Sequence, residues 1–160
     1  MRLLRAFLIL GFACLSGFCH VHQAAAADLV VENAWSRATV GAGGVGVIYL
    51  TIMNRGAASD RLISVTSLVA RRAEVHETRS DADGMVAMAP VAAVGIPAHG
   101  HLDFSPSGLH VMLVDLRKPL AYGDRFVVDL TFEHAGVLRA TVSVEKAGAR
   151  EPHAMPGMKM

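Results

Sequence analysis

Short runs of β-branched residues, each ended by a turn signal, constrain the fold of this chain more than any other feature. Nine such runs follow residue 28, and no stretch keeps a 3.6-residue apolar period long enough for a helix. The runs are Leu29–Ala34, Val45–Met53, Leu62–Val65, Arg72–Glu77, Met85–Pro90, His101–Phe104, His110–Leu116, Arg125–Phe132 and Val137–Val144. Glycine-rich turns lie between them. We therefore predict an all-β domain, a sandwich or barrel of Greek-key type.

The first 27 residues have the composition of an export signal. Arg2 and Arg5 form a positive start, residues 6–18 are apolar, and alanines at 24–27 offer cleavage sites. The apolar run of 13 residues is shorter than the ~20 that a spanning helix needs. We expect cleavage just before Asp28, and Phe18 disfavours lipid attachment to the cysteine that follows it. The mature protein is then expected in the periplasm, with no stable membrane insertion.

Removal of this segment leaves a chain without cysteine. Cys14 and Cys19 both leave with it, so no disulfide framework can form in the remaining 133 residues, which suffice for one domain. These residues carry 13 Lys and Arg against 14 Asp and Glu, a net charge of −1 without a basic block. That charge argues against nucleic acid as a partner. We place the domain at residues 28–148 and a flexible tail at residues 149–160.

Two histidines and two methionines have spacings that suit a metal site on neighbouring strands. His110 and Met112 are two residues apart, so on one strand they point to the same face. His76 and Met88 flank an expected hairpin turn. In one register residue 76 lies opposite residue 88; in the other it faces residue 90, and Met88 is its diagonal neighbour on the same face. Met85 falls on the opposite face in both registers. The sequence thus predicts a site made of His76, Met88, His110 and Met112.

Imidazole and thioether donors without a thiolate favour Cu(I). A thioether is soft and suits Cu(I) far better than Mg, Ca or Mn, whereas Zn prefers thiolate, imidazole or carboxylate. A blue-copper electron-transfer site needs a cysteine thiolate, which the mature chain lacks. The sequence shows no nucleophile with its base and no paired carboxylates, so we do not expect an enzyme. Each histidine or methionine has a structural alternative, which leaves a β-sandwich interaction module open. Glu77, beside His76, is expected to be solvated.

The end of the chain adds a second group of soft donors. His153, Met155, Met158 and Met160 place four donors within eight residues, as in His/Met-rich tracts that bind metal. The alternative is a disordered end with incidental methionines. Two functional hypotheses follow: the tail supplies a second site, for Cu(II) through His153, or it captures copper and relays it to the main site.

The spacing of the four main residues resembles that of the periplasmic copper chaperones of the PCu(A)C family. The family pattern is His, ten residues, Met, twenty-one residues, His-x-Met. Twenty-one residues separate Met88 from His110 here, but eleven separate His76 from Met88. The extra residue fits most simply in the turn at residues 80–84, and Met85 is the alternative to Met88. Other segments similar to the family span about residues 30–144: Asn33–Arg37, Gly46–Asn54, Asp60–Leu62, Glu74–Glu77 and Leu116–Leu120.

This resemblance implies a fold, a function and a partner. The implied fold is a cupredoxin-like β-barrel with an exposed Cu(I) site. The implied function is delivery of copper to a cytochrome c oxidase centre, with CuA as the first candidate. The partner is then the oxidase subunit that accepts copper, or another periplasmic copper chaperone. General periplasmic copper storage or resistance fits the same residues. We expect the protein to be a monomer.

Overall fold

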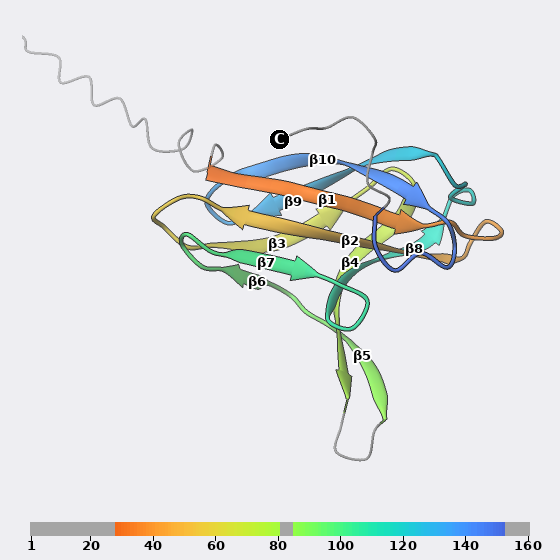
Figure 1. Cartoon of the computed structure of the whole chain (residues 1–160), viewed down its shortest axis with the longest axis horizontal. Helices are drawn as coiled ribbons and strands as arrows, with labels where there is room; N and C mark the ends of the chain where they lie inside the picture. The colour runs from red at the N-terminus through yellow and green to blue at the C-terminus, as the bar shows by residue number, and fades with distance from the viewer. Residues whose placement is uncertain (1–27, 81–84, 153–160) are drawn as a thin grey trace, which may run out of the picture.

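The computed structural model describes residues 28–80 and 85–152. The ten elements along these residues are all β-strands (Figure 1). The strands are β1 (Leu29–Arg37), β2 (Val45–Asn54), β3 (Asp60–Thr66), β4 (Ala70–Ser80), β5 (Val86–Pro90), β6 (Val94–Ile96), β7 (His101–Phe104), β8 (Leu109–Leu116), β9 (Arg125–Phe132) and β10 (Gly136–Glu145). The all-β prediction is confirmed. All nine predicted strands are present, and only the three-residue β6 was missed.

Several predictions concern residues outside those described. They are the export signal at residues 1–27, residues 81–84 of the turn at 80–84 that was expected to hold the extra residue, and the donors from His153 to Met160. Among the described residues, no helix is long and apolar enough to cross a membrane.

The strands form one sheet that closes on itself. Their order is β5-β4-β8-β7-β2-β1-β10-β9-β3-β6, and β3 also pairs with β4, where Val65 lies opposite Ala73. The pairing of β3 with β4 closes the strands from β4 to β3 in this order into a barrel. Strands β5 and β6, at the two ends of the order, lie outside it. Neighbours in the sheet are often distant in sequence: β8 pairs with both β4 and β2, and β1 lies between β2 and β10. Such long connections are the mark of a Greek-key arrangement.

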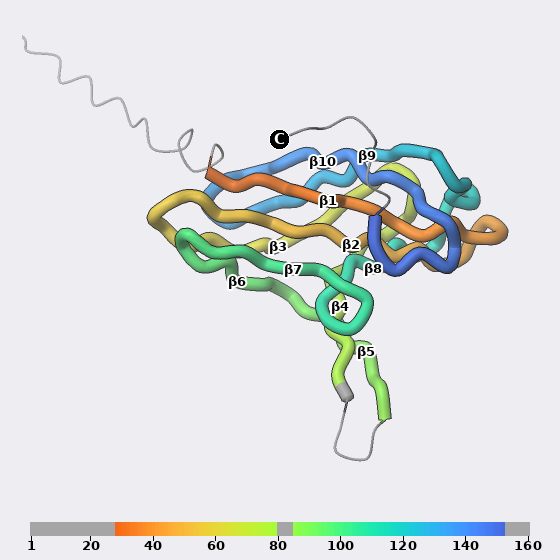
Figure 2. The backbone as a smooth tube through the Cα atoms, viewed as in Figure 1, coloured from red at the N-terminus to blue at the C-terminus, as the bar shows by residue number. Residues whose placement is uncertain are grey.

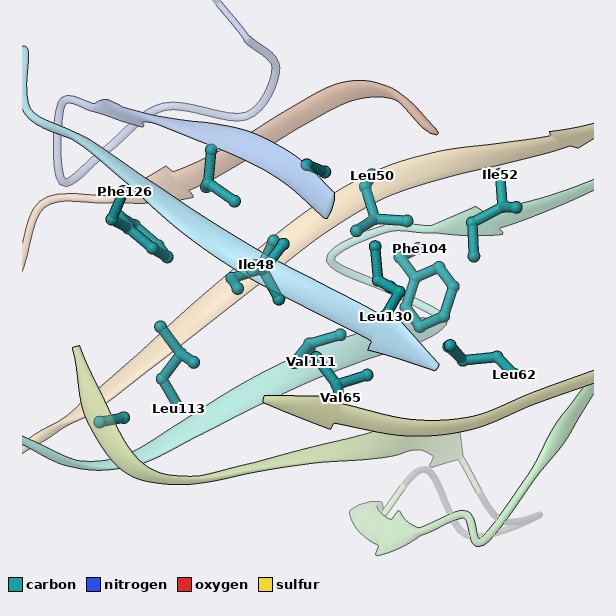
Figure 3. Packing of buried hydrophobic residues seen from close by; sticks show 14 of the residues in the cluster. Ile48, Leu50, Ile52, Leu62, Val65, Phe104, Val111, Leu113, Phe126 and Leu130 are labelled. Carbon is teal, nitrogen blue, oxygen red and sulfur yellow. The ribbon is translucent and has the colours of Figure 1, made fainter. Parts of the chain in front are cut away.

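Alternation along the strands separates a packed interior from an outer face. Ile48, Leu50 and Ile52 on β2 point inward and are at most 2% exposed, and Val111 and Leu113 on β8 meet them (Figure 3). Each such side chain contributes about 1.5–3 kcal/mol when it is fully buried. Because successive side chains point to opposite faces, the residues before and after Val111 on β8, at positions 110 and 112, face outward.

The β4–β5 hairpin projects beyond the barrel (Figure 2). The first part of β4 pairs with β8 as far as Glu77, and its last five residues pair with β5. In the strand order of residues 28–80 and 85–152, β5 pairs along one edge alone, and its side chains at Val86 and Met88 are 64% and 60% exposed. The outer face of β8 and β4 therefore continues onto the exposed β4–β5 hairpin.

Candidate metal centre

His76 lies at the point where three strands meet. It is directly opposite His110 across the β4–β8 pair, and directly opposite Pro90 across the β4–β5 pair. The second of the two predicted registers, in which residue 76 faces residue 90, is therefore the observed one. The two histidines share the outer face of the sheet, and their ring centroids are 6.1 Å apart.

The two methionines flank His76 on opposite sides. Met112 lies on β8 opposite Glu74, and Met88 lies on β5 opposite Thr78. Glu74 and Thr78 are each two residues from His76 on β4, so both methionines are its diagonal neighbours and project from the same face. The structure thus places all four predicted ligands on one face of the β5-β4-β8 strands.

Met85 is set apart from this face by the same alternation. Ser80 pairs with Val86, which puts position 86 on the face of His76 and position 85 on the other face. Its side chain is 70% exposed. The observed register therefore places Met88 on the face of His76, and strand alternation puts position 85 on the other face.

The four side chains differ sharply in their exposure. His110 is 3% exposed and the side chain of His76 is 13% exposed, whereas Met112 is half-buried and Met88 is 60% exposed. An ion held by these groups would therefore have two imidazoles beneath it and a thioether at the surface.

Hydrogen bonds hold both imidazole rings in place. His76 Nε2 is 3.2 Å from Glu74 Oε2, and His110 Nδ1 is 3.1 Å from the carbonyl oxygen of Gly108. A metal ion lies about 2 Å from a ligating ring nitrogen. The ring centroids of His76 and His110 are 6.1 Å apart, a separation at which two imidazoles can bind one ion.

Glu74 is a site residue that sequence reasoning missed. The sequence drew attention to Glu77, which follows His76 directly. On a strand, however, the residue two positions away shares the face. Glu77 instead pairs with Arg79 at 2.7 Å. The signal that identifies Glu74 is the Glu-x-His spacing combined with a confident strand assignment.

Harder donor sets are absent from the part of the chain described. Within it, no group of three or more His, Cys, Asp or Glu side chains is placed to hold a metal ion. The imidazole of His101 is 3.3 Å from Asp103, and that of His134 is 3.2 Å from Asp60. A metal centre at His76 and His110 would thus depend on thioethers, which fits a soft ion better than a hard one.

Aromatic residues extend the same face across β2 and β1. Trp35 pairs with Tyr49, their ring centroids are 4.8 Å apart, and both side chains are buried. The guanidinium of Arg37 lies 6.0 Å and 5.6 Å from the two ring centroids, and its Nε donates a hydrogen bond to the carbonyl oxygen of Ala149 at 2.8 Å. Val47, two residues before Tyr49, is directly opposite Met112. The C-terminal segment therefore starts on the face that carries the candidate ligands.

Comparisons with known proteins find one matching family model and a similar putative lipoprotein. The family model described as "Putative lipoprotein LpqE-like" matches residues 29–144. Putative lipoprotein Lxx21020 of Leifsonia xyli subsp. xyli (strain CTCB07) is 28% identical over 159 residues, which cover 94% of this chain and 95% of the relative.

Two similar solved structures contain copper. The copper-bound PCuAC domain from PmoF2 is 28% identical, has a TM-score of 0.63, and matches over 74% of this chain and 93% of that domain. The Cu(I)-bound DR1885 from Deinococcus radiodurans is 26% identical, has a TM-score of 0.57, and matches over 78% of this chain and 84% of that protein. The cupredoxin-like fold implied by the resemblance is thereby confirmed. The chain belongs to the LpqE-like family, which is the family of the PCuAC domains.

Proposed function

We propose that this chain is an exported metallochaperone that binds one Cu(I) through His76, Met88, His110 and Met112 and passes it to another protein. The observation that carries the proposal is the strand register, which sets His76 opposite His110 and places both methionines diagonal to His76 on one face. Four neutral donors, two imidazoles and two soft thioethers, suit Cu(I) and leave its charge uncompensated. Binding should therefore be tight but reversible.

The gradient of exposure across the site provides a route for transfer. Met88 is 60% exposed at the end of the sheet, whereas His110 is 3% exposed. A donor from an acceptor protein can displace the exposed thioether first, while the two imidazoles still hold the ion. Ligands are then exchanged one at a time, and copper is never released free. This activity is binding and transfer, without covalent chemistry, so we propose that the protein is not an enzyme.

Two similar proteins support copper as the cargo, since the PmoF2 domain is copper-bound and DR1885 is Cu(I)-bound. The acceptor we propose is a copper centre of cytochrome c oxidase, CuA in the first place. The transfer would take place in the periplasm, because residues 1–27 have the composition of an export signal.

The test is an anaerobic titration of residues 28–160 with Cu(I) in competition with a chromophoric chelator. We expect one tight site without a blue absorption band, which is lost in Met112→Leu. The loaded protein is then mixed with an apo-oxidase copper domain, and the copper on each protein is measured after separation. Absence of tight Cu(I) binding would contradict the proposal and leave an interaction module. Binding without transfer would favour storage over delivery.

We further propose that His153, Met155, Met158 and Met160 provide a second copper site, with Cu(II) bound through His153. The support is the anchoring of the segment before them: Arg37 holds Ala149 on the face of the main site. His153 is four residues further on, and four extended residues span at most about 13–14 Å. Removal of residues 153–160 should lower the copper stoichiometry or slow transfer. Unchanged stoichiometry and unchanged rate would contradict both roles of the tail.

A further inference from the structure

The carboxylate of Glu74 lies between the candidate site and solvent. Its Oε2 is 3.2 Å from Nε2 of His76, and its Oε1 is 3.3 Å from Nη1 of Arg72. Glu74 lies directly opposite Met112 across the β4–β8 pair, so it belongs to the face of the site. Its side chain is 37% exposed, compared with 13% for His76. One carboxylate oxygen is thus used by a mostly buried imidazole and the other by a surface guanidinium.

This contact assigns the proton of the His76 ring. A carboxylate oxygen accepts hydrogen bonds and donates none, so Nε2 of His76 must carry the hydrogen. In a neutral imidazole the lone pair is then on Nδ1. Within the described residues, Nδ1 of His76 is buried and has no hydrogen-bond partner. A buried polar atom without a partner is costly, and a metal ligand is one of the few roles that accounts for it.

His110 has the opposite tautomer. Its Nδ1 lies 3.1 Å from the carbonyl oxygen of Gly108, and a carbonyl can only accept. Nδ1 of His110 therefore carries the hydrogen and Nε2 carries the lone pair. The two rings, 6.1 Å apart, thus offer different nitrogens: Nδ1 of His76 and Nε2 of His110.

We propose that Glu74 is a positioning residue of the copper site, which fixes the Nε2–H tautomer of His76 and thereby selects Nδ1 as its copper ligand. Arg72 holds the carboxylate in place from the solvent side. This inference rests on the proposed function, because it assumes that His76 binds copper. A hydrogen bond from a ligating histidine to a carboxylate is a common way to orient the ring, and its loss typically lowers metal affinity by about 10–100-fold.

The experiment compares Glu74→Ala with Glu77→Ala. Both remove a carboxylate within two residues of His76 on β4, but Glu77 lies on the other face and pairs with Arg79. Long-range ¹⁵N–¹H correlation spectra of the metal-free proteins report which ring nitrogen of each histidine is protonated. We expect Nε2–H at His76 in the starting protein and in Glu77→Ala, and a mixture of tautomers in Glu74→Ala. His110 should keep Nδ1–H in all three proteins.

Anaerobic Cu(I) titration of the same proteins gives the second measurement. Affinity should fall about 10-fold in Glu74→Ala and remain unchanged in Glu77→Ala. Glu74→Gln should recover part of the loss, because the amide oxygen can still accept from Nε2. An unchanged His76 tautomer in Glu74→Ala would overturn the proposal, as would a changed tautomer with unchanged affinity. Failure of the starting protein to bind Cu(I) would overturn the proposed function, whereas the tautomer assignment is judged on the metal-free protein.

Discussion

His110 and Met88 are proposed ligands of the same ion, yet their surroundings are opposite. His110 is 3% exposed, lies on a strand with neighbours on both sides, and is hydrogen-bonded to Gly108. Met88 is 60% exposed and lies on the edge strand of a projecting hairpin (Figure 1). The imidazole is ordered before any ion arrives, whereas ordering a long exposed thioether costs conformational entropy at the moment of binding.

The difference indicates that the two halves of the site have separate tasks. A preorganised ligand contributes most to affinity, because little entropy is lost when the ion binds. An exposed ligand contributes less to affinity but can be replaced by a donor from another protein. We therefore expect the buried pair to determine how tightly copper is held, and the hairpin to determine how fast it leaves.

The largest effect is expected from His110→Ala. Loss of a residue that hydrogen-bonds to a metal ligand already lowers metal affinity by about 10–100-fold. Loss of a buried ligand itself should therefore lower Cu(I) affinity by more than about 100-fold. The measurement is the anaerobic competition titration, with circular dichroism to verify that the strands are retained.

His101→Ala is the matched control for this substitution. His101 lies on β7 and is exposed, with its imidazole 3.3 Å from Asp103. The control removes an imidazole without touching the candidate site, and Cu(I) affinity should stay unchanged. If both variants bound Cu(I) as the starting protein does, the buried pair would not be the anchor of the ion.

A smaller effect on affinity is expected from Met88→Leu. Leucine keeps the apolar volume and removes the sulfur, and we expect a loss of roughly ten-fold, or about 1.4 kcal/mol. The rate of copper transfer to an acceptor domain should change more than the affinity does. Met85→Leu, on the other face of the hairpin, should alter neither quantity. Equal losses of affinity in Met88→Leu and His110→Ala would remove the distinction between the two halves.

The contrast between the halves was only partly predictable from the sequence. Strand alternation has a fixed period of two, so the shared face of His110 and Met112 could be predicted without knowing their neighbours. The same rule set Met85 apart. The pairing of His76 was left between two registers, because turn geometry sets register in a hairpin and the turn sequence allowed both. The observed pairing with Pro90 decides between them.

Burial and hydrogen bonding at the site depend on contacts between distant segments. The burial of His110 could not be predicted from β8 alone, because the strands that pair with β8 (β4, β2 and β7) are not all next to it in the sequence. The sequence predicted no role for Glu74, and the pairing with β8 places it opposite Met112. Strand β6 was missed because its three residues are too few for alternation to show.

The smallest effect on copper is expected from Asp60→Ala, which tests whether a contact that stabilises the fold away from the site also affects Cu(I) binding. The Asp60 carboxylate is 6% exposed and accepts hydrogen bonds from the backbone N–H groups of Arg61, His134 and Ala135, and from the His134 ring. These contacts join the start of β3 to the β9–β10 turn, on strands other than those of the site. Asp60→Ala should lower the free energy of unfolding by roughly 2–3 kcal/mol, measured by urea denaturation, with Cu(I) affinity unchanged. A parallel fall in affinity would mean that the site is not preorganised by its own strands.

The pH dependence of this contribution has a definite sign. Burial raises the pKa of Asp60, but the hydrogen bonds from Arg61, His134 and Ala135 outweigh it, so the pKa lies below its ordinary value of 3.8. A carboxyl whose pKa is lowered by folding stabilises the protein fully above its unfolded pKa and loses that effect as the pH falls through the folded value. The difference in unfolding free energy between the starting protein and Asp60→Asn should therefore be constant at neutral pH and shrink below about pH 3.8. A difference that persisted undiminished in acid would show that the variant loses packing and not a charged acceptor.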